Sequence, residues 1–308
     1  MGESNNPRIR TPFPYFGGKR RIAREVWSRF GPVTTYVEPF CGSAAVWLNC
    51  PHGPRRREVL NDLDGFVANF WRAVKYDPDA VADSADHQMI EIDLHAWFNR
   101  LHEIRRDGAL IERLRADPTH YDPEIAGKWA FVLCAAYGGT NRTTTRLHPT
   151  GRGLLLLARK SRQAVLDYLH GLAERLRGVA VLCADWRRAI RYAVCATKWK
   201  NATVGVFLDP PYAISTGRDQ RLYVTDTRDD SISAAVRDWC IENEQHRIAL
   251  CGLEGEHNVL EDRGWSVFGW RSGGGYYRPG GSTRDKATRQ ERVWFSPACG
   301  QELVGWDS

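Results

Sequence analysis

An apolar run at residues 204–208 and the two prolines that follow it constrain the fold of this chain most strongly. The run is typical of a short, buried strand. Pro210 and Pro211 cannot donate hydrogen bonds to a sheet, so the strand has to end at Asp209. Open α/β sheets bind their ligands at the carboxyl ends of their strands. The sequence therefore predicts an α/β fold with Asp209 at the ligand-binding edge.

The tetrapeptide at residues 209–212 combines a carboxylate, backbone carbonyls and a flat aromatic ring. An amino group conjugated to a purine is a poor nucleophile. It would become more reactive if Asp209 and the carbonyl of Pro210 each accepted a hydrogen bond from one of its N–H groups. These two hydrogen bonds would draw the nitrogen towards tetrahedral geometry. Tyr212 would then stack on a base lifted out of a duplex. The alternative is a strand followed by a proline turn whose aspartate caps a helix.

Length and charge limit the class of protein. A chain of 308 residues with 43% hydrophobic residues can bury one large core, or a core plus an inserted subdomain, and we expect two lobes. The formal net charge of +6 favours an anionic partner. Basic residues cluster at 8–24 and 142–162, where a solvated face is at least as good an explanation as DNA contact.

The hydropathy pattern and the cysteines favour an intracellular protein. No stretch approaches the roughly 20 apolar residues that span a bilayer, and the polar N-terminus has no apolar signal-peptide core. We therefore expect a soluble, cytoplasmic protein. The eight cysteines are scattered and include no Cys-x-x-Cys pair, which predicts reduced thiols without a zinc or redox role.

Periodicity predicts α/β patterning on both sides of a helical insertion. Strands are expected at residues 35–40, 57–60, 179–183, 204–208, 247–251 and 291–296. Helices are expected at 20–29, 44–49, 66–74, 93–106, 128–136, 162–176, 187–197 and 231–244. The segments 137–153 and 271–289 are rich in glycine and arginine, and we expect the second to be a loop. The prediction is a domain of residues 1–75 and 170–308, interrupted by a subdomain of residues 76–169.

Three further strand ends carry acids. Glu38, followed by Phe40, could meet a cationic amino acid and a purine. Asp62 lies where a carboxylate accepts both hydroxyls of a ribose, although a helix N-cap is the alternative. Asp185 could bind a purine amino group while Trp186 covers the ring.

The segment from Phe16 to Lys19 places two glycines and a lysine just before a helix. This arrangement would let the backbone approach a ligand carboxylate, although a turn with an exposed lysine is the simpler explanation. It is not a Walker A loop, because Arg20 stands where Ser or Thr would hold magnesium. Two other chemistries are excluded. Methylation at cytosine C5 needs a Pro-Cys nucleophile in this region, and the sequence has none there. A metal site needs closely spaced histidines and acids, which the nine histidines do not show.

With these motifs in this order, the chain resembles DNA adenine-N6 methyltransferases of the Dam type over most of residues 12–250. The resemblance lies in residues 15–19, 36–43, 61–62, 184–186 and 209–212. It implies a Rossmann-like sheet of the class I methyltransferases, with an inserted, mostly helical target-recognition subdomain. It also implies S-adenosylmethionine as the cofactor, double-stranded DNA as the substrate and no metal.

The resemblance assigns roles to individual residues. The catalytic residues would be Asp209, Pro210, Pro211 and Tyr212. The cofactor-binding residues would be Tyr15, Phe16, Gly17, Gly18, Lys19, Glu38, Pro39, Phe40, Gly42, Asp62, Leu63, Asp185, Trp186 and Asp209. The DNA-binding residues would be Asn141, Arg142, Arg146 and Arg152, since Arg and Asn suit guanine and adenine edges.

Two departures from the family pattern matter. Ala44 stands where the family usually has a glycine, which is costly if the position has positive φ. Residues 138–143 match the DNA-reading hairpin only loosely, so the target sequence is not carried over.

Several alternatives stay open. The chain could be a catalytically inactive DNA-binding relative, or could methylate RNA adenine, cytosine N4 or protein glutamine. A cognate restriction endonuclease as partner, a monomeric or dimeric state, and a bacterial, archaeal or phage origin are equally open.

Overall fold

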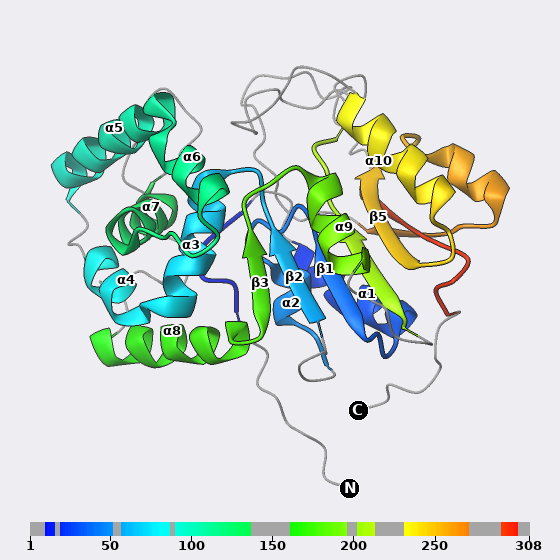
Figure 1. Ribbon diagram of the computed structural model, residues 1–308, viewed down its shortest axis with the longest axis horizontal. Coiled ribbons are helices and arrows are strands. Elements are labelled where there is room, and N and C mark those ends of the chain that lie inside the picture. Colours follow the sequence, from blue (N-terminus) through cyan, green and yellow to red (C-terminus); the bar gives the residue numbers. More distant parts are fainter. Residues whose placement is uncertain are drawn as a thin grey trace, which may run out of the picture.

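The computed structural model describes residues 10–15, 19–51, 57–86, 90–136, 161–195, 202–212, 231–270 and 291–300. A seven-stranded sheet forms the centre of the molecule (Figure 1). Within the described ranges, no helix is both long and apolar enough to cross a bilayer.

The sheet has the order β3-β2-β1-β4-β5-β7-β6. Its strands are β1 (Thr35–Glu38), β2 (Arg57–Asn61), β3 (Val179–Leu182), β4 (Val204–Leu208), β5 (Arg247–Leu253), β6 (Ser266–Trp270) and β7 (Glu291–Phe295). The first five strands pair in parallel, and β7 lies antiparallel between β5 and β6. The strand order therefore reverses between β1 and β4, where open sheets of this kind bind ligands.

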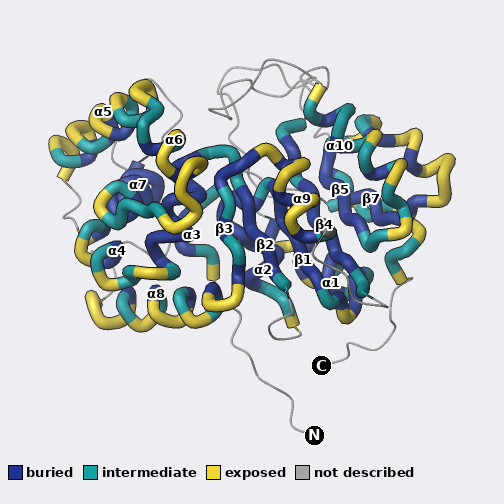
Figure 2. The backbone as a smooth tube through the Cα atoms, viewed as in Figure 1, coloured by how far each residue is buried: buried dark blue, intermediate teal, exposed yellow. Residues whose placement is uncertain are grey.

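Helices cover both faces of this sheet. The elements beside the sheet are η1 (Lys19–Arg21), α1 (Ala23–Phe30), α2 (Ala45–Leu48), α9 (Trp186–Cys195), α10 (Ser231–Glu242) and η4 (Asn258–Arg263). Alternate strand residues face opposite sides: Tyr36 belongs to the buried cluster that includes α1 and α2, and Val37 to the cluster that includes α9 and α10. Most strand residues are buried (Figure 2).

A helical region lies beside the β3 edge of the sheet (Figure 1). It consists of α3 (Gly65–Tyr76), α4 (Pro78–Ala85), α5 (Glu91–Asp107), α6 (Ala109–Ala116), α7 (Pro123–Ala135) and α8 (Arg162–Leu176). The buried helix α7 packs against α3, α4 and α5. Rings of Phe13, Phe70 and Trp129 meet edge-on or tilted between α3 and α7. One continuous buried cluster thus joins the helical region to one face of the sheet.

Two arginines fasten the helical region to the sheet. Arg72, only 2% exposed, donates to the carbonyls of Val181, Leu114, Asp117 and His120. Arg175 of α8 donates to both carboxylate oxygens of Glu58, at 2.5 and 2.7 Å. Helix α8 runs uninterrupted through residues 169 and 170, where the expected domain boundary falls.

Local sequence explains where several of these helices begin. Asp64, Asp77, Asp122 and Ser161 accept backbone N–H groups at the starts of α3, α4, α7 and α8, respectively. Proline follows Asp77 and Asp122 in the first turn, where its missing N–H costs nothing.

The predicted fold class, a Rossmann-like methyltransferase sheet with added helices, is confirmed. The six predicted strands are present, with β1 and β3 ending before residues 40 and 183, respectively. The structure adds α4, α6 and β6, which the periodicity did not predict. The segments 137–153 and 271–289 lie outside the described residues.

Candidate active site

The carboxyl ends of β1 and β4 bring Glu38 and Asp209 to the switch point of the sheet. Thr35, Tyr36 and Val37 of β1 pair in register with residues 204–206 of β4, so the two strands end side by side. Glu38 is 2% exposed and accepts the hydroxyl proton of Tyr36 at 2.9 Å. Two acids expected at separate strand ends therefore share one edge.

A lysine, a tyrosine and two carboxylates meet around Asp209. Lys19 lies 3.1 Å from Asp209 Oδ1 and donates to Tyr212 Oη at 2.6 Å. Both groups also reach Glu291, because Lys19 Nζ lies 3.1 Å and Tyr212 Oη 3.2 Å from Glu291 Oε2. Tyr212 Oη lies 3.3 Å from Asp209 Oδ1. Lys19 is only 6% exposed, so this network is largely shielded from water.

Burial raises the pKa values of the acids at this edge. Desolvation raises the pKa of Glu38 from 4.5 to about 8, and the nearby Asp209 and Asp62 reinforce the shift. Desolvation also raises the pKa of Asp62 to about 7, with a further contribution from Asp64. The pKa of Asp209 is raised by burial as well, although Lys19 opposes the shift. The edge therefore favours a cationic ligand.

The turn after β1 is held in an unusual backbone conformation. Gly42 has φ of +46°, and a Cβ there would overlap the ring of Tyr15. Its N–H donates to Asp62 Oδ2 at 2.9 Å, and its carbonyl accepts from Trp71 Nε1 at 2.8 Å. Ala44, where the resemblance leads us to expect a glycine, also has positive φ, +50°, so the alanine carries a backbone strain of about 1 kcal/mol.

Asp62 is not the N-cap of α3. That cap is Asp64, whose Oδ1 accepts the N–H of Phe66 at 2.9 Å. Asp62 instead accepts the N–H groups of Gly42 and Asp64, one on each oxygen. The capping alternative for Asp62 is therefore wrong, and its carboxylate is fixed at the end of β2.

Asn61 ties three strand ends together, a role that sequence reasoning missed. It is 1% exposed, donates to the carbonyls of Pro39 and Ala184, and accepts the N–H of Ala184 at 3.0 Å. A buried asparagine at a strand end is a detectable sequence signal, but its partners depend on the strand order. This bridge fixes the spacing of the ends of β1, β2 and β3.

The third strand end is more exposed. Asp185 accepts the N–H of Arg187 at 2.9 Å, and its side chain is 58% exposed. Trp186 is 5% exposed, with the guanidinium of Arg187 over its ring at 4.5 Å. The Phe40 ring, which is partly exposed, lies 6.4 Å from the indole. Asp185 thus acts as a helix cap whose carboxylate still faces solvent.

The remaining predicted residues divide into two groups. Pro39, Leu63, Pro210 and Pro211 lie at the ends of β1, β2 and β4 with the acids. The residues outside the described ranges are Phe16, Gly17, Gly18, Asn141, Arg142, Arg146 and Arg152. Glu291 was missed, because it begins an antiparallel strand and carries no motif.

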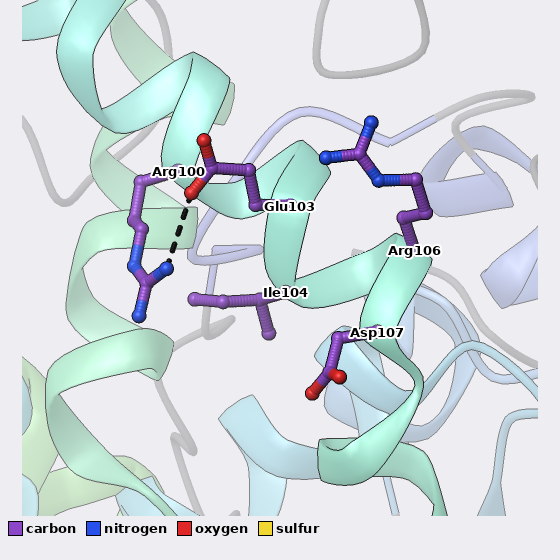
Figure 3. Close-up of a pocket in the computed structure, with 5 residues that line it drawn as sticks. All are labelled: Arg100, Glu103, Ile104, Arg106 and Asp107. Atoms are coloured by element: carbon purple, nitrogen blue, oxygen red, sulfur yellow. Dashed lines mark hydrogen bonds and ion pairs between the residues drawn. The ribbon is translucent and has the colours of Figure 1, made fainter.

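A cavity of about 450 Å³ lies on α5, away from these strand ends (Figure 3). It is lined by Arg100, Glu103, Ile104, Arg106 and Asp107. Arg100 and Glu103 pair at 3.1 Å and are 61% and 54% exposed, respectively. This groove is a solvated charged surface and contributes no group to the strand-end site.

Comparison with known proteins agrees with the geometry. Residues 15–136 match the family model of D12 class N6 adenine-specific DNA methyltransferases. The matched segment includes Lys19, Glu38 and Asp62 and ends before Asp209. No curated protein matches the sequence. Together, the family match, the sheet order and the acids at its edge support an adenine-specific DNA methyltransferase.

Proposed function

We propose that the protein transfers a methyl group from S-adenosylmethionine to N6 of an adenine flipped out of duplex DNA. The observation that carries the proposal is the carboxylate of Asp209, only 16% exposed at the end of β4, next to the strand that ends in Glu38. An acceptor in a shielded position next to a site for a cationic ligand is what amine methylation requires.

The target adenine would be held by the residues that follow β4. Among the described residues, Lys19 and Tyr212 contact Oδ1 of Asp209, and in this proposal Oδ2 accepts one N6 hydrogen. The carbonyl of Pro210 would accept the other hydrogen. The Tyr212 ring would stack on the flipped base. These contacts would raise the electron density on N6, and Asp209 would stabilise the positive charge that develops there.

The residues at the strand ends fit S-adenosylmethionine. Glu38 is buried with a pKa raised to about 8, so a cationic amino group would restore its charge. Asp62 accepts two backbone N–H groups and can still accept ribose hydroxyls. Asp185 and the partly exposed Phe40 ring suit a purine. The bound cofactor supplies an electrophilic methyl group, and the protein supplies orientation and electrostatics.

The helical region would carry target recognition. Exposed arginines on α5 suit phosphate contacts, and Arg100 is 61% exposed. The expected base-reading residues Asn141, Arg142, Arg146 and Arg152 remain predictions. In this proposal, residues 76–169 form the recognition subdomain of the Dam-type arrangement.

Methyl transfer from tritiated S-adenosylmethionine into duplex DNA tests the proposal. The wild type should label adenine, and Asp209→Asn should lower the single-turnover rate by at least about 100-fold, because it removes the charge that stabilises the reacting nitrogen. Cofactor binding should persist. The exposed Asp262→Asn is the matched control and should retain the wild-type rate. Wild-type rates in Asp209→Asn would refute the assignment, and no labelled adenine from wild-type protein would refute the function.

A further inference from the structure

Glu291 is a buried acid at the active edge that none of the motifs contains. It is 8% exposed and begins β7, in register with Leu253 of β5 and Trp270 of β6. Because β7 is antiparallel to β5, its first residue lies at the edge where the parallel strands end. A buried carboxylate at a strand end requires compensating partners.

The partners of Glu291 are also the partners of Asp209. Lys19 Nζ lies 3.1 Å from one oxygen of each carboxylate. Tyr212 Oη lies 3.2 Å from Glu291 Oε2 and 3.3 Å from Asp209 Oδ1. One ammonium group and one phenol therefore bridge two carboxylates.

The charge balance of this cluster depends on Glu291. Lys19 and Asp209 together are neutral, and a neutral pair attracts a cation weakly. In the proposed reaction the C–S bond breaks, the sulfur keeps the electron pair, and the new C–N bond leaves a positive charge on N6 until one proton is lost to water. Among the described residues in contact with Lys19, Glu291 restores one net negative charge to the site.

Glu291 also keeps the ammonium group of Lys19 paired during the reaction. When the adenine amino group donates to Oδ2 of Asp209, it draws negative charge away from the carboxylate and weakens the pairing of Oδ1 with Lys19. A buried ammonium group that loses its partner is strongly destabilised. Glu291, already 3.1 Å away, keeps Lys19 paired.

We propose that Glu291 is a positioning residue of the methyl-transfer site, which keeps Lys19 in place and supplies the negative charge that Lys19 removes from Asp209. This proposal rests on the proposed function. It assigns to the start of β7 a role that neither the sequence motifs nor the family match contains.

Glu291→Gln tests the charge, because the amide oxygen can still accept the two hydrogen bonds. With saturating cofactor, the single-turnover methylation rate should fall at least about tenfold. Binding of sinefungin, which carries a cationic amine in place of the sulfonium, should weaken by about tenfold relative to that of the neutral S-adenosylhomocysteine. The control is Glu254→Gln. Glu254 is an exposed acid that directly follows the end of β5, and its replacement should change neither the rate nor the relative binding of the two ligands.

A rate within about twofold of the wild type, or equal weakening of both ligands, would overturn the proposal, because a purely structural role does not discriminate by ligand charge. A second variant covers the case in which Glu291→Gln folds poorly. Lys19→Met combined with Glu291→Gln removes both partners and returns the cluster to one negative charge. This double variant should bind sinefungin and S-adenosylhomocysteine with the wild-type ratio of affinities, because the net charge of the cluster is the same, and a ratio shifted by about tenfold would overturn the proposal. Wild-type protein that fails to methylate adenine would refute the proposed function itself, whereas active wild type with unaffected variants refutes only this inference.

Discussion

Replacement of Glu38 by glutamine should stabilise the protein without ligand and weaken its cofactor binding. Burial raises the pKa of Glu38 from 4.5 to about 8. The folded protein therefore retains a proton that the unfolded chain releases above pH 4.5. The stabilisation from this retained proton is complete below pH 4.5 and is lost as the pH rises towards 8.

The size of the effect follows from the shift. At pH 7 the carboxyl of the unfolded chain is ionised, because the pH lies about 2.5 units above its pKa. Keeping Glu38 protonated therefore lowers the free energy of unfolding by about 3 kcal/mol. The glutamine has no such titration, and its amide oxygen can accept from Tyr36. Glu38→Gln should thus raise the free energy of unfolding by about 1–3 kcal/mol at pH 7, after the cost of a new buried NH₂ group.

Urea unfolding of wild type and Glu38→Gln without cofactor measures this difference. The advantage of the variant should grow by about 3 kcal/mol between about pH 5.5 and about pH 8. Cofactor affinity should fall in the variant, since the expected partner of the amino group is gone. The exposed Glu254→Gln serves as the control and should follow the wild type. Parallel pH dependence of wild type and Glu38→Gln would refute the reasoning.

Three further predictions concern stability. Arg72→Met leaves four backbone carbonyls without their donor and should lower the free energy of unfolding by about 3 kcal/mol or more in urea titration. Gly42→Ala, with positive φ and a Cβ that overlaps Tyr15, should destabilise by about 1–2 kcal/mol and weaken cofactor binding in calorimetry, whereas Gly171→Ala, with open space in α8, should stabilise. Burial lowers the pKa of His257, so stability should be complete above about pH 6.5 and fall as the pH decreases, and thermal unfolding of His257→Gln should show a smaller fall.

Much of the sheet and its active edge could be predicted from sequence, because the signals are local. The apolar run before Asp209 and the prolines after it determine where β4 ends. Parallel strands end on one side, so the sequence alone was enough to expect Glu38, Asp62 and Asp209 at strand ends along one edge of the sheet. The family match supports the same chemistry from a different part of the chain.

Other features depend on long-range packing that a single sequence does not encode locally. Glu291 reaches the site only because β7 inserts antiparallel between β5 and β6. Lys19 pairs with Asp209 and Glu291, a geometry that a Gly-Gly-Lys segment does not predict. Helix α4 is short and consists mainly of small and acidic residues, and β6 is partly exposed. Both lack the apolar periodicity that marks the other elements. A capping role for Asp62 was open by sequence, and only the contact of its carboxylate with the Gly42 turn, far away in the chain, leaves the cap of α3 to Asp64.

The most direct test of the account is mass spectrometry of nucleosides from the DNA of a methylation-free host that expresses the protein. The account predicts N6-methyladenine in DNA with the wild type and its absence with Asp209→Asn. Unmodified adenine with the folded wild type, or N4-methylcytosine as the modified nucleoside, would contradict it.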